Sequence, residues 1–397
     1  MFELLAPAGD LVKLRSALHF GADAVYFGGD FSLRAAARMS REDLAAGIGL
    51  CHAAGKKAYV TLNIFPKDGD FPALEEQIDD LAVFGADGVI LSDPGLLRLC
   101  VQRAPGLPVH LSTQANTLNR FSAAFWADQG VRRIVLAREL SLAEIAGIRE
   151  GLDPSVKLEA FVHGAMCIGY SGRCLLSNYL HGRDANRGAC VQACRWAYRL
   201  TEAEEGRELE VWEDERGSYF LNSRDLCMIG HLKELAEAGV ESFKIEGRMK
   251  SEFYVGTVVN AYRRAADALI AGREVPEGLS EEVAKAGHRP FTTAWYLGPN
   301  GETEFPASAA PVTDYRFAAL VLERRGDRVL VEQRNRFFEG DELEMISPGL
   351  APGQKLRVRG LADEEGNPVR DAKRVQQRLL LPDGGLLQPL DMLRKKA

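Results

Sequence analysis

The 397-residue chain lacks several features that would assign it to a common functional class. No apolar run approaches the roughly 20 residues that cross a bilayer, and the N-terminal MFELLAPAGD has no basic signal-peptide region. We therefore expect a cytoplasmic protein that does not enter the membrane. The H-E-x-x-H motif of zinc proteases and the G-x-S-x-G elbow of serine hydrolases are also absent, which excludes both classes by motif.

Cysteine is scarce, and its distribution is uneven. Of seven cysteines, four lie close together in the spacing Cys167-x6-Cys174-x15-Cys190-x3-Cys194, and Cys227 follows later. The surrounding text, HGAMCIGYSGRCLLSNYLHGRDANRGACVQACRWAY, is rich in Gly, Asn and Arg and predicts an ordered loop. Disulfides and inert core thiols are two alternatives, but low cysteine usage without an export signal favours a reducing compartment.

Four thiols gathered on one loop favour a metal site, because zinc and iron–sulfur clusters both take four thiolates. Structural zinc usually binds two C-x2-4-C pairs, whereas only Cys190 and Cys194 have that spacing here. We therefore favour a [4Fe–4S] cluster over zinc, with Cys167, Cys174, Cys190 and Cys194 as ligands and Cys227 as the alternate fourth ligand. The loop also has a local positive charge that would offset such a cluster or meet a phosphate, from Arg173, Arg183, Arg187, Arg195 and Arg199 against Asp184.

Short apolar β-type runs alternate with helical periodicity over residues 1–250. A glycine repeatedly ends a helix just before the next strand, as in GADAVYFG, GADGVILSD, GVRRIVLA and GVESFKIEG. Strands joined by helical crossovers run parallel, so we predict an α/β fold with a TIM-like (β/α)8 barrel, either regular or incomplete and distorted. A doubly wound open sheet is the alternative, but no G-x-G-x-x-G follows the first strand. The predicted strands are Leu4–Pro7, Ala24–Gly28, Ala58–Asn63, Gly88–Asp93, Val109–Thr113, Arg133–Ala137, Leu158–His163 and Ser242–Gly247.

The chain is too long for one compact core, so more than one domain is expected. We assign the barrel to residues 1–287, with the cysteine-rich loop at about 164–200 directly after the seventh strand. Loops that follow strands build the functional face of such barrels, which places the cysteines at the barrel mouth. Pro and Gly turns mark a linker over residues 288–315, and the alternating pattern of residues 316–397 predicts a small β-barrel domain.

Polar residues at the ends of predicted strands are candidate site residues. We expect Asn63, Gln114, Arg138 and Arg248 to bind substrate, and His163, Lys244 and Glu246 to take part in catalysis. Charges in a buried strand need partners, so a basic partner is expected to hold Glu246. A structural ion-pair network of Lys244, Glu246 and Arg248, and a structural role for His163, are the alternatives.

The net charge of −7 argues against non-specific nucleic-acid binding. Residues 316–397 nevertheless carry 16 Lys and Arg against 13 Asp and Glu, a net of +3, which leaves −10 for residues 1–315. The tail Arg394-Lys395-Lys396 is therefore expected to form a basic patch, although a solvated surface is an equal alternative.

The run EAFVHGAMCIGYSGRCLLSNYL resembles the signature of the peptidase U32 family, and NRGACVQACRWAY, SRDLC and SFKIEGRMKS resemble segments that follow it there. The resemblance extends from ELLAPAGD into the C-terminal domain. It implies an iron–sulfur protein that supports oxygen-independent hydroxylation, with prephenate as oxygen donor where this is known. Substrates in the family are a tRNA wobble uridine, a ribosomal RNA cytidine or a ubiquinone precursor.

Length and the NRGACVQACRWAY form resemble most the tRNA-hydroxylating branch. The resemblance then implies formation of 5-hydroxyuridine, with tRNA as partner and prephenate as a carboxylated co-substrate, and it leaves the oligomeric state open. Collagenase-like proteolysis, for which the family was named, is the alternative. The loop arginines and the basic C-terminal domain are expected to form two separate positive patches, one beside the cluster and one away from it. The distant patch would anchor the tRNA body through its phosphates, and the barrel mouth would receive a flipped base.

Overall fold

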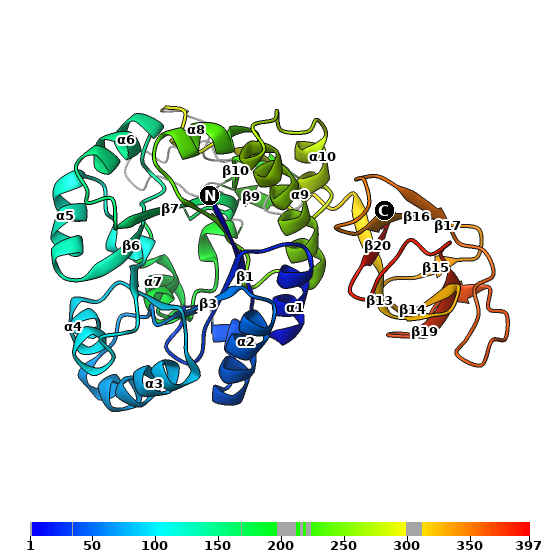
Figure 1. The fold of residues 1–397 in the computed structure, drawn as a ribbon, viewed down its shortest axis with the longest axis horizontal. Coiled ribbons are helices and arrows are strands. Elements are labelled where there is room, and N and C mark those ends of the chain that lie inside the picture. The colour runs from blue at the N-terminus through cyan, green and yellow to red at the C-terminus, as the bar shows by residue number, and fades with distance from the viewer. Residues whose placement is uncertain are drawn as a thin grey trace.

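The structure, a computed structural model, describes residues 2–33, 35–167, 169–196, 212–214, 217–219, 224–298 and 312–397. Eight parallel strands form a closed barrel, in the order β11-β1-β2-β3-β4-β5-β6-β7 with β7 pairing back to β11 (Figure 1). The predicted TIM-like barrel is confirmed. Its strands are β1 (Glu3–Pro7), β2 (Ala24–Phe27), β3 (Lys57–Thr61), β4 (Gly88–Leu91), β5 (Val109–Leu111), β6 (Val131–Val135), β7 (Lys157–Ala165) and β11 (Ser242–Ile245).

Helices surround the barrel, and several of them begin at a capping side chain. Asp10, Ser40 and Ser141 each accept a hydrogen bond from a backbone N–H in the first turn of their helix, which satisfies a donor that has no partner within the helix. None of the helices in the described ranges is long and apolar enough to cross a membrane. The helices are α1 (Leu11–His19), α2 (Arg41–Ala53), α3 (Phe71–Phe84), α4 (Pro94–Arg103), α5 (Arg120–Asp128), α6 (Leu142–Glu150), α8 (Leu232–Glu237) and α9 (Glu252–Ile270), with short 3-10 turns η1 (Ala35–Ala37), η2 (Asp68–Asp70), η3 (Thr113–Ala115) and η6 (Ile229–His231).

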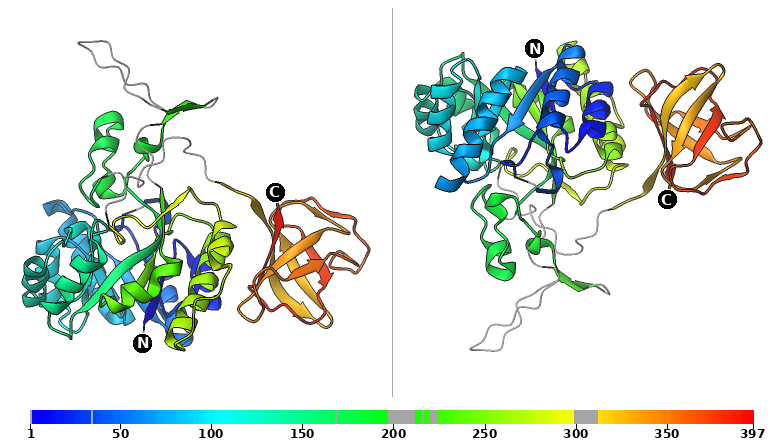
Figure 2. Two further views of the ribbon diagram at one scale, coloured as in Figure 1. Left: turned by 90° about the horizontal axis from the view of Figure 1, so that it is seen from above. Right: turned by 90° about the horizontal axis from the view of Figure 1, so that it is seen from below.

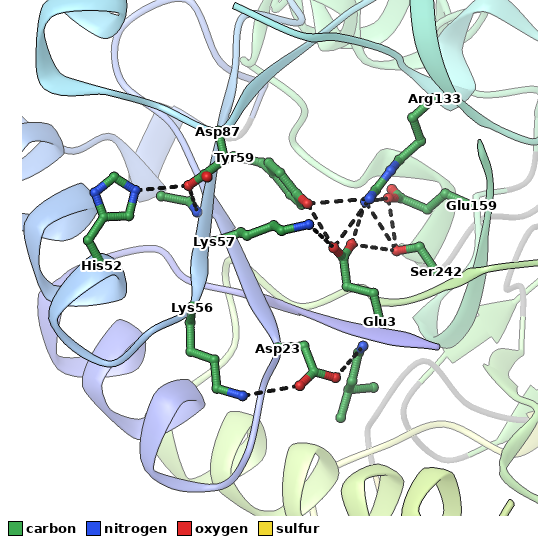
Figure 3. A network of polar contacts seen from close by, with 12 residues as sticks. Glu3, Asp23, His52, Lys56, Lys57, Tyr59, Asp87, Arg133, Glu159 and Ser242 are labelled. Carbon is green, nitrogen blue, oxygen red and sulfur yellow. Dashed lines mark hydrogen bonds and ion pairs between the residues drawn. The ribbon is translucent and has the colours of Figure 1, made fainter. Parts of the chain in front are cut away.

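The interior of the barrel is partly polar. Arg133 on β6 donates to Glu3, to Glu159 (2.9 Å) and to Ser242 (3.3 Å), and the Tyr59 hydroxyl donates to Glu3 (2.7 Å) (Figure 3). Burial alone would raise the pKa of Glu3, but the hydrogen bond and charge of Arg133 hold it below its usual value. Because each buried charge here has an opposite partner, the network closes the end of the barrel at which the strands begin.

Two further strands extend this sheet. β10 (Asp225–Cys227) pairs antiparallel with the end of β7, and β12 (Phe291–Thr292) pairs parallel with β10. Arg289 donates to Asp225 through Nε (3.0 Å) and Nη2 (2.7 Å), and both residues are buried. Part of the predicted linker over 288–315 is therefore held against the barrel by a buried ion pair, a contact that local periodicity does not reveal.

The C-terminal domain is antiparallel and has its own apolar core, which includes Val321, Val331, Leu379 and Leu393. Its main sheet has the order β17-β16-β20-β13-β14-β19, and a separate pair joins β15 to β18. The strands are β13 (Tyr315–Arg325), β14 (Arg328–Gln333), β15 (Phe337–Phe338), β16 (Glu342–Ile346), β17 (Lys355–Arg357), β18 (Asp371–Ala372), β19 (Arg378–Pro382) and β20 (Met392–Lys396). A two-stranded ladder, β8 (Trp212–Asp214) with β9 (Gly217–Tyr219), lies outside both domains.

The predicted basic tail patch is wrong for its first residue. Arg394 on β20 is 0% exposed and donates to Glu282 (2.6 Å) on α10 (Leu279–Ala284) and to Glu344 (2.7 Å) on β16. Lys395 forms an ion pair with Asp341 (2.6 Å), which leaves Lys396 as the exposed cation of the tail. The tail charge therefore fastens the C-terminal domain to the barrel domain, because its partners lie on both sides of the boundary.

Candidate active site at the barrel mouth

A cavity of about 170 Å³ lies at the end of the barrel where the strands finish. The four cysteines predicted as ligands all line it: Cys167, Cys174, Cys190 and Cys194. Six polar residues predicted at strand ends line it as well: Asn63, Gln114, Arg138, Lys244, Glu246 and Arg248. The closed barrel thus brings together residues that are far apart in the sequence.

The cysteine loop (Cys167 and residues 169–196) covers this cavity. It contains α7 (Leu176–His181), η4 (Ala185–Arg187) and η5 (Ala193–Arg195). Figure 2 shows the green segment of α7 on the end of the barrel opposite the N-terminus. The cysteines therefore lie on an irregular segment that directly follows β7 at the barrel mouth.

Specific contacts fix the loop to the barrel. Arg187 donates to Asp70 (2.9 Å) and to the Phe65 carbonyl (2.7 Å), and Asn116 Nδ2 donates to the Ser171 carbonyl (3.1 Å). The Arg187 hydrogen bond lowers the pKa of Asp70. Arg187 therefore has a structural partner, which differs from the prediction that it would offset a cluster or bind a phosphate.

The remaining loop arginines fall into two groups. Arg173 and Arg183 are exposed, and neither forms an ion pair within the described ranges. The side chain of Arg195 and all of Arg199 lie outside the described residues. Two cations of the predicted patch are thus available at the loop surface.

Gly172 allows the loop to approach the barrel closely. Its φ is +73°, and a Cβ there would lie 3.0 Å from Phe65 and 3.1 Å from Gln114. A larger residue would be strained by the backbone and would also press against both neighbours. The glycine in YSGRC is therefore needed for the closed position of the loop.

Arg138 connects the barrel wall to the loop. It is buried, and it donates to the Ala165 carbonyl (3.1 Å) and to Ser171 Oγ (3.0 Å). Burial lowers the pKa of Arg138, but the charge and hydrogen bond of Cys167 outweigh burial and raise it. Arg138 is thus a fixed cation beside the first predicted ligand.

Arg248 is held by uncharged groups. It donates to Ser32 Oγ, to Thr61 Oγ1 (2.9 Å) and to the Leu33 carbonyl, while Ser32 and Thr61 also bond each other (2.5 Å). A Cβ at Gly28 would lie 2.1 Å from Thr61 Oγ1, so this cradle requires a glycine. The cradle fixes the direction in which the guanidinium of Arg248 enters the cavity wall.

The predicted network of Lys244, Glu246 and Arg248 does not form. Lys244 instead pairs with Glu159 (2.8 Å), and both are buried. Burial lowers the pKa of Lys244, and the Glu159 carboxylate partly opposes this. No ion pair between described residues involves Glu246, so the basic partner expected for it is absent from this part of the chain. Glu246 is the one carboxylate among the described residues that line the cavity.

Asn63 and Gln114 are partly committed to the protein itself. Asn63 Oδ1 accepts from the Leu33 amide (3.0 Å), and Gln114 Nε2 donates to the Asn63 carbonyl (2.9 Å). Gln114 Oε1 also accepts from Ser112 Oγ (3.1 Å). These side-chain amides shape the cavity wall, and part of their hydrogen-bonding capacity is already used within the protein. Fewer donors and acceptors are therefore left for a substrate than the sequence suggests.

His163 does not line the cavity, unlike Lys244 and Glu246, which were also predicted to take part in catalysis. It is 1% exposed, its ring lies among Tyr254, Tyr262 and Phe291, and its Nδ1 lies 3.3 Å from the Tyr262 hydroxyl. Burial lowers its pKa to about 3. Glu159 and Phe161, which precede His163 at alternate positions of β7, face the barrel interior. The pairing of β7 with β11 shifts register between Phe161 and His163, and such an irregularity redirects the side chain that follows it. These surroundings favour the structural role that was the alternative for His163.

Cys227, the alternate ligand, lies opposite His163 in the β7–β10 pair and outside the cavity lining. Burial raises the pKa of its thiol, and Tyr262 lies 3.9 Å from its sulfur. A cysteine protease needs a thiolate beside a charged or polarisable imidazole. Burial disfavours both ionised forms here, so this pair does not make a protease dyad.

Ser32, Thr61, Ser171 and Glu159 were not predicted as site residues. No local sequence motif marks Ser32, Thr61 or Ser171, because their roles depend on contacts with residues that are distant in the sequence. Glu159 did have a signal, since a carboxylate inside the apolar strand LEAFVHG needs a buried cation. That signal shows that Glu159 needs a buried cation, and the fold supplies Arg133 and Lys244.

The cysteines share a cavity without forming a compact ligand set. Among the residues that the structure describes, no group of three or more His, Cys, Asp or Glu side chains is arranged to hold a metal ion. The donor set is nevertheless all sulfur, and the Gln192 amide donates to Cys190 Sγ (3.4 Å). Amide donors and a nearby arginine are contacts that stabilise thiolates on a cluster, so the donor chemistry fits iron–sulfur ligation.

Comparison with known proteins supports the family resemblance. A family model described as "Peptidase family U32" matches residues 9–305, and "Peptidase family U32 C-terminal domain" matches residues 313–394. The "tRNA hydroxylation protein P1" of Bacillus subtilis is 39% identical, covering 99% of this chain and 94% of that protein. The "tRNA hydroxylation protein P" of Escherichia coli is 36% identical, covering 87% of this chain and 86% of that protein.

A third relative is named for a different substrate. The "23S rRNA 5-hydroxycytidine C2501 synthase" of Escherichia coli is 40% identical, covering 82% of this chain and 46% of that longer protein. The two family models together cover both domains, and the cysteine loop lies inside the first. The chain belongs to peptidase family U32.

Proposed function

We propose that this protein hydroxylates the wobble uridine of tRNA to 5-hydroxyuridine, with prephenate as oxygen donor and a [4Fe–4S] cluster as cofactor. The observation that carries the proposal is that four cysteines and the cations Arg138, Lys244 and Arg248 line one cavity at the barrel mouth. Relatives named for tRNA hydroxylation, similar over most of the chain, support the RNA substrate.

The proposed ligands are Cys167, Cys174, Cys190 and Cys194. Cys194 is preferred over Cys227 because it lines the same cavity as the other three, whereas Cys227 lies on β10 outside that lining. When bound, such a cluster supplies one-electron redox chemistry at the cavity wall. Arg138, which hydrogen-bonds with Cys167, would stabilise the thiolate charge at that ligand.

The proposed prephenate site uses the arginines. Prephenate carries two carboxylates, and guanidinium groups bind carboxylates in a bidentate geometry. Arg138 has no carboxylate ion pair among the described residues, and its donors go to a carbonyl and a hydroxyl. Arg248 faces the same cavity from its Ser32–Thr61 cradle. The two cations support binding of a small dianion.

Glu246 and Lys244 are the proposed groups for moving protons. Hydroxylation at C5 of uridine removes a proton from that carbon, so an acceptor near the base is required. Glu246 lines the cavity without an ion-pair partner in the described ranges, and Lys244 is held by Glu159. Glu246 would accept the proton, while Lys244 would stay protonated and orient the bound dianion.

Specific observations bear on two alternative functions, ribosomal RNA hydroxylation and proteolysis. A ribosomal RNA substrate is favoured by the name of one relative, but this chain covers less than half of that protein. Peptidase activity is favoured by the family description. The neighbouring Cys227 and His163 do not suit it, because burial raises the pKa of the thiol and lowers the pKa of the imidazole. The tRNA substrate is therefore preferred.

The proposal is tested in a strain from which the gene is deleted, grown without oxygen. Complementation with the wild-type protein should restore 5-hydroxyuridine in tRNA, as measured by mass spectrometry of nucleosides. Cys174→Ala should not restore it. The matched control is Cys100→Ala, which removes a buried thiol of α4 outside the cavity and should restore it. Unchanged tRNA in the deletion strain contradicts the proposal, and a change confined to ribosomal RNA favours the alternative.

A further inference from the structure

The cysteine loop has an outer face as well as the inner face that lines the cavity. Three large side chains on the outer face are strongly exposed: Tyr179 is 87% exposed, Leu175 68% and Trp196 42%. Single exposed apolar residues are common on protein surfaces, but several on one short segment mark an interaction site. Ser177 is the buried residue of α7, so most of this helix is surrounded by solvent.

Leu175 and Tyr179 lie on one side of α7, and His181 and Trp196 lie at its C-terminal end. The Tyr179 amide donates to the Leu175 carbonyl (2.8 Å), which places the two residues one helical turn apart on the same side. At the end of the helix the exposed ring of His181 packs edge-on against Trp196, with ring centroids 4.5 Å apart. We call Leu175, Tyr179, His181 and Trp196 the apolar ridge.

The ridge begins at the rim of the cavity. Tyr170 lines the cavity and is 46% exposed, and its carbonyl accepts from the Arg173 amide (3.0 Å) just before α7. Arg173 precedes the helix, and Arg183 follows it. Both guanidinium groups are exposed and have no ion pair with any described residue. The surface beside the mouth is thus aromatic, apolar and positively charged.

This chemistry fits single-stranded nucleic acid. Bases stack on aromatic side chains, arginines meet the phosphates, and neither contact requires a particular base sequence. A protein with a net charge of −7 has little general attraction for RNA, so a local positive surface must provide it. A base that enters a cavity must first leave its stack, and its neighbours then need a new surface.

We propose that the apolar ridge is a stacking surface for the unpaired nucleotides that flank the base in the cavity. The proposal deepens the proposed function, because it rests on an RNA substrate reaching the cavity. Tyr179 supplies the main stacking face, and Arg173 and Arg183 bind the adjacent phosphates. The ridge recognises the single-stranded state of the RNA, while the cavity selects the base.

Binding measurements test this without turnover. The probe is a fluorescent single-stranded uridine-rich RNA oligonucleotide, and the reference probe is a duplex that contains the same strand. Tyr179→Ala should weaken single-strand binding about tenfold, and Tyr179→Phe should retain it because the ring is kept. Duplex binding should change little. The matched control is Phe121→Ala on α5, which removes an aromatic ring that is 74% exposed outside the cavity lining and should bind like the wild type.

Three results would overturn the proposal. The first is equal single-strand affinity in Tyr179→Ala and wild type, and the second is an equal loss of affinity in Phe121→Ala. The third is a change in oligomeric state caused by Tyr179→Ala at unchanged RNA affinity, which would assign the ridge to contacts between copies. Because Tyr179 is exposed, thermal denaturation should be unaffected in every variant. The nucleoside content of tRNA in the deletion strain tests the proposed function separately. If Tyr179→Ala weakens RNA binding but the tRNA of the deletion strain is unaltered, the proposed function is rejected and the RNA-binding role of the ridge is kept.

Discussion

Arg394 donates to Glu282 across the boundary between the two domains, at 2.6 Å and without solvent exposure. The same guanidinium bonds Glu344 of its own domain, and Lys285 approaches Glu344 from the barrel side (3.0 Å). Phe253 and Phe317 stack beside this cluster across the same boundary, with centroids 5.4 Å apart. The C-terminal domain is therefore held in one position against α9 and α10, so any RNA contact it makes is at a fixed distance from the cavity.

Replacement of Arg394 tests this rigid attachment. Arg394→Ala removes the buried cation that Glu282 and Glu344 share and leaves Lys285 as their one remaining cationic partner among the described residues. It should destabilise the protein by about 3 kcal/mol in chemical denaturation. Lys396→Ala removes an exposed charge and should change stability by less than about 0.5 kcal/mol. Equal effects of the two substitutions would mean that the cluster does not hold the domains together.

Acid should loosen the same boundary. Burial tends to raise the pKa of Glu344, but hydrogen bonds from Lys285 and Arg394 lower it below its ordinary value of 4.5. The stabilisation is thus complete above pH 4.5 and is lost as the pH falls through the lower folded-state value. Melting temperatures measured across this range should fall more steeply for the wild type than for Glu344→Gln. Parallel curves for the two proteins would contradict the assignment.

The cradle of Arg248 gives a prediction about co-substrate binding. Thr61→Val removes the hydroxyl that accepts from Arg248 at 2.9 Å while keeping the side-chain shape. Loss of a hydrogen bond to a charged group should raise the KM for prephenate about tenfold, with a smaller change in kcat. Thr117→Val is the control, because the Thr117 hydroxyl is buried and has no hydrogen-bond partner in the described structure. Equal kinetics in both variants would remove Arg248 from the prephenate site.

The choice of the fourth ligand is decided by iron analysis. Anaerobically purified protein should contain about four irons and four sulfides per chain. Cys194→Ala should lose the cluster absorbance, and Cys227→Ala should retain it, because Cys194 lines the cavity and Cys227 does not. The reverse pattern would make Cys227 the ligand. Stoichiometric zinc without iron would reject the cluster itself.

The sequence predicted the features that repeat along the chain. Each barrel strand is a short apolar run, and glycines such as Gly85 (φ +78°) mark where a helix ends before the next strand. The order of the strands then follows from parallel pairing with helical crossovers, which places the cysteine loop after β7 at the mouth. These are local patterns, and the closed barrel is a consequence of them.

The contacts that depend on distant residues could not be predicted in this way. Lys244 pairs with Glu159 rather than with Glu246, because residues on neighbouring strands face each other inside the barrel and residues two apart on one strand do not exchange an ion pair here. Arg394 looked like part of a charged tail, but β20 pairs with β13 and β16 in the middle of a sheet. Local charge shows that a partner is needed, but the fold decides which partner it is.

The central claim is tested most directly by a reaction in extract. A desalted extract of the deletion strain, kept free of oxygen, supplies unmodified tRNA and any other protein that the reaction requires. Addition of the purified protein together with prephenate should produce 5-hydroxyuridine in tRNA, and omission of prephenate should abolish it. Formation of the same amount without prephenate, or no 5-hydroxyuridine from protein that contains its cluster, would contradict the account.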